Sequence, residues 1–269
     1  MTRIALGLEY DGRAFHGWQR QKDLSSVQAA LEDALTQIAD HPLGVLCAGR
    51  TDTGVHASAQ VVHFDTSASR PLTAWVRGVN ALLPPSVAVL WAKEVNAQFH
   101  ARYSAYRRRY RYWLVNRPQR PGLLAGRVGW FHAPLALDAM RAAAQCLVGE
   151  HDFSAFRAAG CQAKSPVKLL TRAEIRQAHH ATGVVFAFDF EASAFLHHMV
   201  RNLVGSLVYV GKGAWSPEHL REVLASRNRA LAAPTFPPDG LYFQGPVYDP
   251  ALAIPEIVAE IPDFQLFPV

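Results

Sequence analysis

Apolar and polar residues alternate with two different periods along the first hundred residues. Short segments in which apolar and polar residues alternate, or which are rich in β-branched residues, are predicted strands. The regions between them have apolar residues at helical spacing and are predicted helices. The predicted strands are Arg3–Tyr10, Val45–Leu46, Gln60–Asp65 and Val87–Val95, and the predicted helices are 27–38 and 72–83. This order, β-α-β-β-α-β, is that of a ferredoxin-like unit.

The second half repeats this order of elements without repeating the sequence. Its predicted strands are Ala105–Asn116, Arg172–His179, Val184–Glu191 and Leu241–Val247, and its predicted helices are Leu137–Val148, Phe195–Val210 and 217–226. His151–Leu169 is predicted to be a long polar loop. Two such units side by side would place a cleft between them.

The sequence therefore predicts an α+β protein. Two ferredoxin-like, RRM-like halves contribute antiparallel sheets that join into one broad mixed sheet with a central active-site cleft. The predicted halves are residues 1–104 and residues 105–248. Residues 249–269 are an apolar, proline-rich tail that we expect to pack over the body or against a neighbouring subunit.

Composition narrows the class of partner and compartment. Half of the 269 residues are hydrophobic and the formal net charge is +5, so a large core and a polyanionic partner are both compatible with the chain. The three cysteines form no C-x-x-C pair, which indicates a reducing, cytoplasmic location without a zinc site. The histidines lack the spacing of a metal site. Neither a signal peptide nor an apolar run of roughly 18 residues is present, so no membrane segment is expected.

The segment Leu46–Ala57 (LCAGRTDTGVHA) carries the candidate chemistry. Gly49 and Gly54 bracket Arg50 and Asp52 between two predicted strands. The glycines permit positive φ and close approach of other groups, and a neighbouring cation favours an ionised carboxylate, the form needed for nucleophilic attack. An isolated Asp-x-Gly is most often simple turn chemistry, however.

Two further segments mix basic and aromatic residues. The loop after the first strand reads FHGWQRQ, which suits contacts to bases and phosphates or equally a surface loop with a packed Trp18. The strand from Ala105 reads AYRRRYRYWLVN and holds four arginines within five positions. Such a strand is either a solvated sheet face or an RNA-binding surface.

Several motifs in order resemble the tRNA pseudouridine synthase A family. They are EYDG with FHGWQRQ, CAGRTDTGVHA, FHARY, RRRYRYW, CQAKSP and FLHHMVRNLVGSL. The resemblance extends from Arg3 to about Val247 and leaves the tail uncovered. It implies an RNA-modifying isomerase that converts uridine to pseudouridine at positions 38, 39 and 40 of the tRNA anticodon stem-loop. It also implies a homodimer that binds the anticodon arm and uses no cofactor or metal.

The resemblance also assigns site residues. Asp52 maps to the family's catalytic aspartate, Arg201 to the basic residue that pairs with it, and Tyr110 to the tyrosine that stacks on the extruded base. Arg50 would fill the space left by the flipped uridine, and Arg70 is a weaker RNA-binding candidate. The implied tRNA contacts are Phe99, His100, Ala101, Arg102 and Tyr103, and the base-flipping loop Cys161, Gln162, Ala163, Lys164 and Ser165, with Lys168 as a further phosphate ligand.

Two other functions are weighed against this one. Asp52-Thr53-Gly54 spells the D-T-G of aspartic proteases, but a second such motif is absent from the sequence and Arg50 would oppose a shared proton. The β-α-β-β-α-β order also fits a non-catalytic tandem RNA-binding module. The RNP1 run of RRM domains is not found, and Asp52 distinguishes the two, because a binding module would tolerate Asn there.

Overall fold

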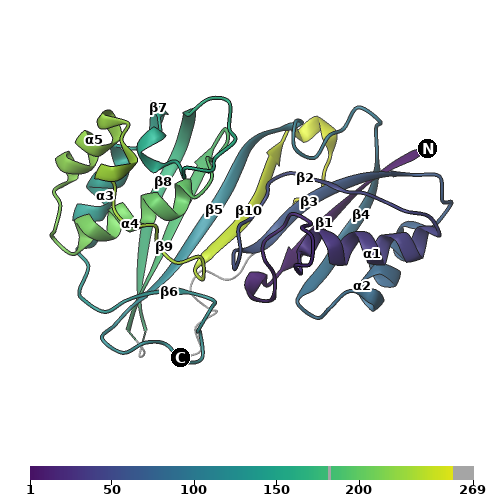
Figure 1. Cartoon of the computed structure of the whole chain (residues 1–269), viewed down its shortest axis with the longest axis horizontal. Coiled ribbons are helices and arrows are strands. Elements are labelled where there is room, and N and C mark those ends of the chain that lie inside the picture. Colours follow the sequence, from purple (N-terminus) through teal and green to yellow (C-terminus); the bar gives the residue numbers. More distant parts are fainter. Residues whose placement is uncertain (181–182, 257–269) are drawn as a thin grey trace. The chain divides into compact units, whose positions relative to one another are not determined.

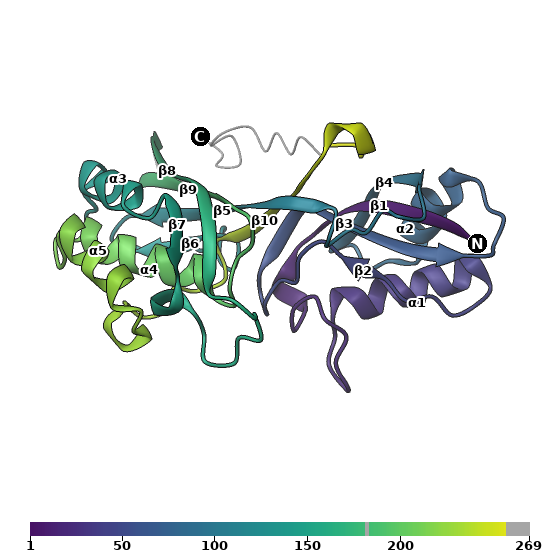
Figure 2. The ribbon, with the colours of Figure 1, turned by 90° about the horizontal axis from the view of Figure 1, so that it is seen from above.

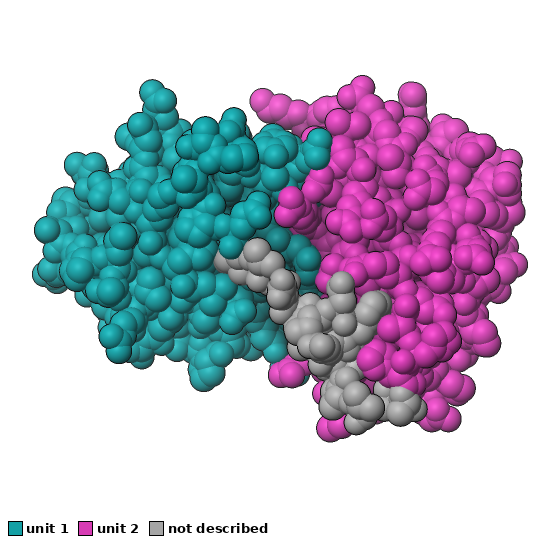
Figure 3. Space-filling model, turned by 180° about the vertical axis from the view of Figure 1, so that it is seen from behind, with its two compact units in different colours: residues 1–108, 242–259 teal, residues 109–241, 260–269 magenta. Residues whose placement is uncertain are grey.

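The computed structural model describes residues 1–180 and 183–256. It is an α+β protein with a mixed, open sheet, which confirms the predicted fold class. Two compact units are present (Figure 3): unit 1 contains Met1–Arg108 and the described residues from Tyr242 onward, and unit 2 contains Arg109–Leu241. Within the described residues, no helix is long and apolar enough to cross a membrane. The predicted domain limits at 104 and 248 stay a prediction.

Unit 1 has the predicted order of elements. Its strands lie in the order β4-β1-β3-β10, with the short β2 paired to β3. β1 lies between β3 and β4 and is antiparallel to both, whereas β10 runs parallel to β3. The bounds are β1 Thr2–Tyr10, β2 Leu46–Cys47, β3 His56–Thr66, β4 Val87–Val95 and β10 Leu241–Tyr248, the last starting one residue before the unit's boundary.

The helices of unit 1 lie together on one side of its sheet (Figure 1). α1 is Val27–Ala39 and buries Val27, Leu31 and Leu35. Its N-cap is Ser26, whose hydroxyl accepts a hydrogen bond from Ala29 N–H. The predicted helix 72–83 is present over residues 72–82; its middle, η2 over Ala74–Gly78, is a π-helical turn that continues directly into α2, Val79–Leu82.

Unit 2 has strands in the order β5-β9-β8-β7, with β6 parallel to β5. Its helices α3, α4 and α5 pack together as one cluster (Figure 2). Met140 of α3 lies directly over Gly211 of α4, where a Cβ would be 2.7 Å from its sulfur. The bounds are β5 Ala105–Asn116, β6 Gly129–Phe131, α3 Leu137–Gln145, β7 Gly149–Asp152, β8 Val167–His180, β9 Gly183–Ala192, α4 Met199–Gly211 and α5 Pro217–Ser226.

Two predictions for unit 2 are wrong in part. The predicted loop His151–Leu169 contains the end of β7 and the start of β8, and it buries Phe153 and Phe156 completely. These aromatics are core residues that the polar surroundings concealed. The predicted helix from Phe195 begins only at Met199, because His198 has the left-handed conformation, with φ of 60°.

The tail is described only up to Glu256, so the rest of the predicted segment lies outside the described residues. Its first part forms a short 3-10 turn over Pro250–Leu252, capped by the carboxylate of Asp249. Lys93 of β4 donates hydrogen bonds to the carbonyl oxygens of Leu252 and Ala253. This part of the tail therefore packs on the sheet of unit 1.

Candidate active site

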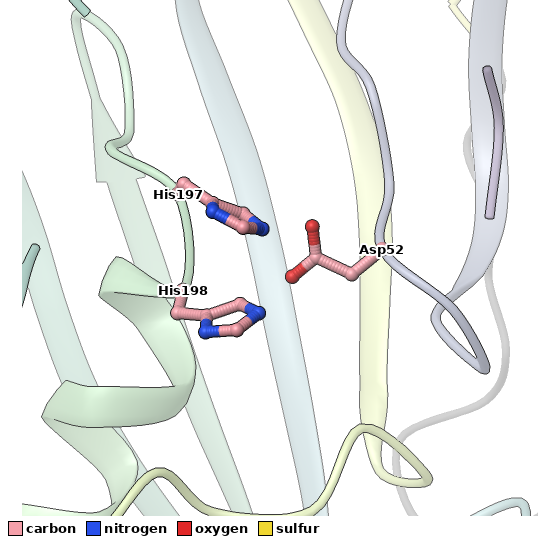
Figure 4. A group of neighbouring side chains, drawn as sticks. All are labelled: Asp52, His197 and His198. Atoms are coloured by element: carbon pink, nitrogen blue, oxygen red, sulfur yellow. The ribbon is translucent and has the colours of Figure 1, made fainter. Parts of the chain in front are cut away.

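Asp52 lies on the irregular connection between β2 and β3, as Figure 4 shows, and is half-buried. The N–H of Val55 donates to the carbonyl oxygen of Asp52 at 3.1 Å, which closes a tight turn. Gly54 within this turn has φ of 77°, a conformation that favours glycine. The predicted strand–loop–strand setting of Asp52 is therefore confirmed.

Thr51, the residue before Asp52, is fixed by two elements. Its buried hydroxyl lies 2.8 Å from the phenol oxygen of Tyr10 at the end of β1. Its carbonyl oxygen accepts a hydrogen bond of 3.0 Å from Trp18 N–H. Burial raises the pKa of Tyr10, so its phenol stays protonated at neutral pH and remains a hydrogen-bond donor.

Gly12 and Gly17, the glycines of the EYDG and FHGW motifs, let the main chain of the loop after β1 lie directly against the main chain of the Asp52 loop. A Cβ on Gly17 would be 2.8 Å from the carbonyl oxygen of Thr51, and Gly17 has φ of 90°. A Cβ on Gly12 would collide with the carbonyl group of Val55. The loop after β1 thus packs its main chain along the segment that carries Asp52, which explains why these motifs occur together.

The other end of the Asp52 loop is held by a buried amide. Gln60 of β3 donates to the carbonyl oxygen of Gly49 at 2.6 Å and accepts from its N–H at 3.4 Å. His56 is also buried; its Nδ1 accepts from Gly12 N–H, and its ring stacks on Tyr242 with centroids 4.6 Å apart. Arg50 between these fixed points is exposed. The loop therefore presents Arg50 outward from a rigid backbone.

The FHGWQRQ loop is a structural element in large part. Trp18 is buried in the core of unit 1. Arg20 forms ion pairs of 2.8 Å with Glu32 and 2.7 Å with Asp33 on α1. The packed Trp18 is therefore confirmed, and Arg20 fastens the loop to the helix, whereas contacts of this loop to RNA stay a prediction.

The predicted tRNA contacts of unit 1 divide into buried and exposed residues. Phe99 and Ala101 are buried, so their side chains anchor the FHARY segment, whereas Arg102 and Tyr103 are exposed. Arg70 is exposed, and its Nε donates to the carbonyl oxygen of Ile38 at the end of α1. This contact complements the negative end of the helix dipole. A role for these residues in binding RNA stays a prediction.

Tyr110 and Arg201 belong to unit 2. The half-buried ring of Tyr110 on β5 makes an edge contact with Phe195, with centroids 5.0 Å apart. Arg201 is half-buried in the first turn of α4, and its Nε donates to the carbonyl oxygen of Phe236 at 2.8 Å. Phe236 N–H returns a hydrogen bond to the carbonyl oxygen of Arg201. The proline-rich segment after α5 thus sets the direction of the Arg201 side chain.

The loop predicted to flip the base, Cys161–Ser165, is built around an arginine that the sequence did not single out. Arg157 Nη2 donates to the carbonyl oxygens of Cys161 and Ala163, at 2.6 and 3.0 Å. Lys168 donates to the carbonyl oxygens of Ser165 and Val167. Gln162, Lys164 and Ser165 are exposed, and Cys161 and Ala163 are half-buried. Lys168 therefore shapes this loop in addition to its predicted role as a phosphate ligand.

The Cys161 sulfur lies where α4 begins. Its Sγ accepts a hydrogen bond of 3.4 Å from His197 N–H. Burial alone would raise the pKa of this thiol, but hydrogen bonds from the backbone of Ala163 and His197 and from Arg157 lower it below its usual value. The rings of His197 and His198 lie 4.0 Å apart on the segment leading into α4 (Figure 4). The loop and the helix start are thus coupled through Cys161.

Two of the arginines of β5, Arg109 and Arg111, form ion pairs with acidic residues of the neighbouring strand β9. Arg109 Nε lies 2.9 Å from Glu191, and Arg111 Nε lies 2.6 Å from the buried Asp189. Asp189 also pairs with Arg176 of β8 at 2.9 Å. This part of the arginine-rich strand is neutralised by neighbouring strands, which favours a structural role for these side chains.

The main residues that sequence reasoning missed are polar and buried. Asn202 of α4 donates to the carbonyl oxygen of Phe156 and accepts from Thr235 and Arg229, at 2.8, 2.7 and 3.1 Å. Gln60 and His63 on β3 are also buried. The available signal was a polar side chain at a core position of an otherwise apolar element. Buried polar groups almost always form hydrogen bonds, so such a residue is expected to hold another segment.

Comparisons with known proteins agree with the motifs. Residues 8–104 and 143–249 match the family described as tRNA pseudouridine synthase. A tRNA pseudouridine synthase A of Dechloromonas aromatica is 65% identical over 94% of this chain and 95% of its own length. Proteins of the same name from Methylobacillus flagellatus and Aromatoleum aromaticum are 58% and 60% identical, over 94% of this chain and 95% and 94% of their own lengths. The predicted resemblance is confirmed: the chain belongs to the tRNA pseudouridine synthase family.

Proposed function

We propose that this protein converts uridine to pseudouridine at positions 38, 39 and 40 of the tRNA anticodon stem-loop. The observation that carries the proposal is the family's R-T-D motif on a loop whose backbone is fixed at both ends of Asp52. A fixed carboxylate is what nucleophilic attack at a single atom of a positioned base requires.

The chemistry is an internal rearrangement of the substrate. Asp52 attacks uridine C6 or ribose C1′, or stabilises a glycal-type intermediate. In each case the bond between N1 and C1′ breaks, the uracil turns, C5 joins C1′, the C5 proton leaves, and N1 takes up a proton. Atoms balance without a redox cofactor, so we expect none to be required.

Other residues supply binding and orientation. Tyr110 stacks on the extruded base and accepts or relays the C5 proton, and Arg201 pairs electrostatically with Asp52. Arg50, exposed on its rigid loop, occupies the space that the flipped uridine leaves and so offsets the cost of unstacking. Arg102, Tyr103 and Lys164 are exposed and available to contact the ribose–phosphate backbone and bases of the tRNA.

The quaternary structure and the compartment are expectations that rest on the family resemblance. We expect a homodimer in which the anticodon arm contacts both subunits, and a cytoplasmic location where tRNA is processed. The cysteines of the described residues are unpaired, which is compatible with a reducing compartment.

The direct test of this function is to determine where in the tRNA pseudouridine is formed. Unmodified tRNA transcript is incubated with the protein, and pseudouridine is then located by carbodiimide labelling and reverse transcription. Stops at positions 38–40 that depend on the protein are expected. Tight binding of the transcript without any such stop would favour the non-catalytic RNA-binding module.

A further inference from the structure

The segment Phe99–Ser104 between β4 and β5 is neither helix nor strand, yet its backbone is fixed. Several of its polar main-chain groups are bound by side chains of unit 1 that lie on four different strands, β1, β3, β5 and β10. The carbonyl oxygens of Phe99, Ala101 and Arg102 accept hydrogen bonds from Arg3, Tyr248 and Arg108, and Ala101 N–H donates to His63. Because so many of its main-chain groups are hydrogen-bonded to side chains, the segment is held in a single conformation.

His63 is central to this arrangement. It lies on β3 and is 2% exposed, and its Nδ1 accepts the hydrogen bond of Ala101 N–H at 3.1 Å. Its ring also makes an edge contact with the ring of His100, with centroids 4.7 Å apart. His100 Nδ1 in turn accepts from the N–H groups of Arg102 and Tyr103, at 3.1 and 3.2 Å.

The chain of ring contacts from His63 through His100 ends at Tyr103 on the surface of the protein. The ring of His100 lies 4.3 Å from the ring of Tyr103, whose side chain is 75% exposed. The guanidinium of Arg102 lies 5.6 Å from the centre of the Tyr103 ring. An exposed aromatic ring beside a cation is the pairing with which proteins stack an unpaired base and hold its phosphate.

We propose that His63 is a positioning residue for RNA binding. Through Ala101 and His100 it holds Tyr103 and Arg102 as a stacking platform with an adjacent cation, preformed for a nucleotide of the tRNA. The inference rests on the proposed function only in taking tRNA as the ligand. It adds a buried residue on β3, outside the Asp52 loop, that acts on affinity and not on the chemical step.

The hydrogen bonds require neutral imidazoles. Both Nδ1 atoms act as acceptors, and a proton on either would replace an acceptor with a second donor facing an N–H group. The charged groups around His63 are Arg3, Asp65 and His100. Burial, followed by His100 and Arg3, lowers the pKa of His63 to about 4, and burial followed by Arg3 lowers the pKa of His100. Both rings are thereby kept in the form that the segment needs.

The test compares two substitutions of His63. His63→Asn places an amide oxygen near the position of Nδ1 and keeps the acceptor for Ala101, whereas His63→Phe keeps a ring and removes the acceptor. Affinity for an unmodified tRNA transcript is measured by titration in the Asp52→Asn background, so that catalysis does not affect it. We expect His63→Phe to weaken binding about tenfold, corresponding to about 1.4 kcal/mol, and His63→Asn to stay within about twofold of the parent. In the active enzyme KM should change and kcat should not.

A double-mutant cycle with Tyr103→Ala separates positioning from a general structural effect. If His63 acts through the platform, His63→Phe has little further effect once Tyr103 has been truncated. Independent, additive losses would overturn the proposal, as would unchanged affinity in a folded His63→Phe protein. Should His63→Phe fail to fold, Tyr248→Phe removes the hydroxyl that holds Ala101 from the other side and enters the same cycle.

The results that would contradict the proposed isomerase differ from those that would contradict the role of His63. A protein that binds tRNA but forms no pseudouridine would contradict the isomerase, and the binding cycle would still decide the role of His63. A protein whose tRNA affinity does not respond to Tyr103→Ala would contradict the platform, even if pseudouridine is formed.

Discussion

The phenol oxygen of Tyr10 lies 2.8 Å from Oγ1 of Thr51, and both side chains are buried. Tyr10 ends β1, and Thr51 directly precedes Asp52. The hydrogen bond therefore connects the first strand of unit 1 to the residue beside the candidate nucleophile. It is one of the contacts that set the position of the Asp52 backbone.

Replacing Tyr10 with Phe removes this hydrogen bond and leaves Oγ1 of Thr51 without it. We expect a loss of about 1 kcal/mol in the free energy of unfolding. We also expect kcat to fall several-fold with KM nearly unchanged, because the position of Asp52 is affected and the RNA-binding surface is not. Denaturant unfolding and steady-state kinetics measure the two effects. Tyr106→Phe, at an exposed tyrosine, is the control and should change neither.

Gly17→Ala should damage the site through the backbone. Gly17 has φ of 90°, and an added Cβ would lie 2.8 Å from the carbonyl oxygen of Thr51. Either the loop after β1 or the Asp52 loop must move, so we expect a loss of kcat of at least about tenfold, since displacements of about 1 Å can cost more than that. Gly122→Ala is the matched control, because a Cβ there meets no atom within 4 Å. Equal activity of both variants would show that the close packing is unimportant.

The sequence predicted the elements of unit 1 well because their apolar periodicity is undisturbed. It placed Asp52 correctly between two strands because glycines and a short apolar run frame it. It could not show that Gly12 and Gly17 pack against that loop, since the contact joins backbones from separate segments. In unit 2 the buried Phe153 and Phe156 stand in a polar stretch, and periodicity over so few residues does not separate core from loop.

Asn202→Ala should destabilise the protein more than any exposed asparagine does. The substitution leaves a buried carbonyl oxygen of Phe156 without its donor, and it removes the acceptor shared by Arg229 and Thr235. We expect a loss of about 2–3 kcal/mol in the free energy of unfolding. Asn228→Ala, which removes one exposed contact to Ala230, should cost clearly less. Similar losses in the two variants would contradict this account of Asn202.

Stability should fall with acidification in a defined window. His63 has a pKa lowered to about 4 in the folded protein, against about 6.5 when unfolded. The unfolded chain therefore binds more protons between these values, so the contribution of His63 is complete above pH 6.5 and is lost as the pH falls towards 4, by on the order of 1–3 kcal/mol. Asp65, whose pKa is lowered by Arg3, contributes its own loss only below about pH 4.

Unfolding free energies measured from pH 7 to pH 4 test this window. His63→Asn does not titrate there, so its stability should depend less steeply on pH than that of the wild type. The same slope in both proteins would mean that other groups carry the dependence.

The candidate site was predictable only as far as the motifs reach. Asp52, Tyr110 and Arg201 were assigned by resemblance, not by spacing, because an Asp in a turn and an Arg on a helix are ordinary features. The residues that orient the loops are Gln60, His63, Arg157 and Asn202, and each acts through hydrogen bonds to segments far away in the sequence or to loop carbonyl groups. Such partners become visible only once the chain has folded.

The central claim is that Asp52 drives formation of a bond between C5 and C1′. Forming this bond expels the hydrogen on C5, so tritium release from tRNA labelled with [5-³H]uridine reports the reaction directly. Wild-type protein should release tritium, and Asp52→Asn should release none while binding the same tRNA. Release by both proteins would move the chemistry away from Asp52, and tight binding without release by either would contradict the isomerase itself.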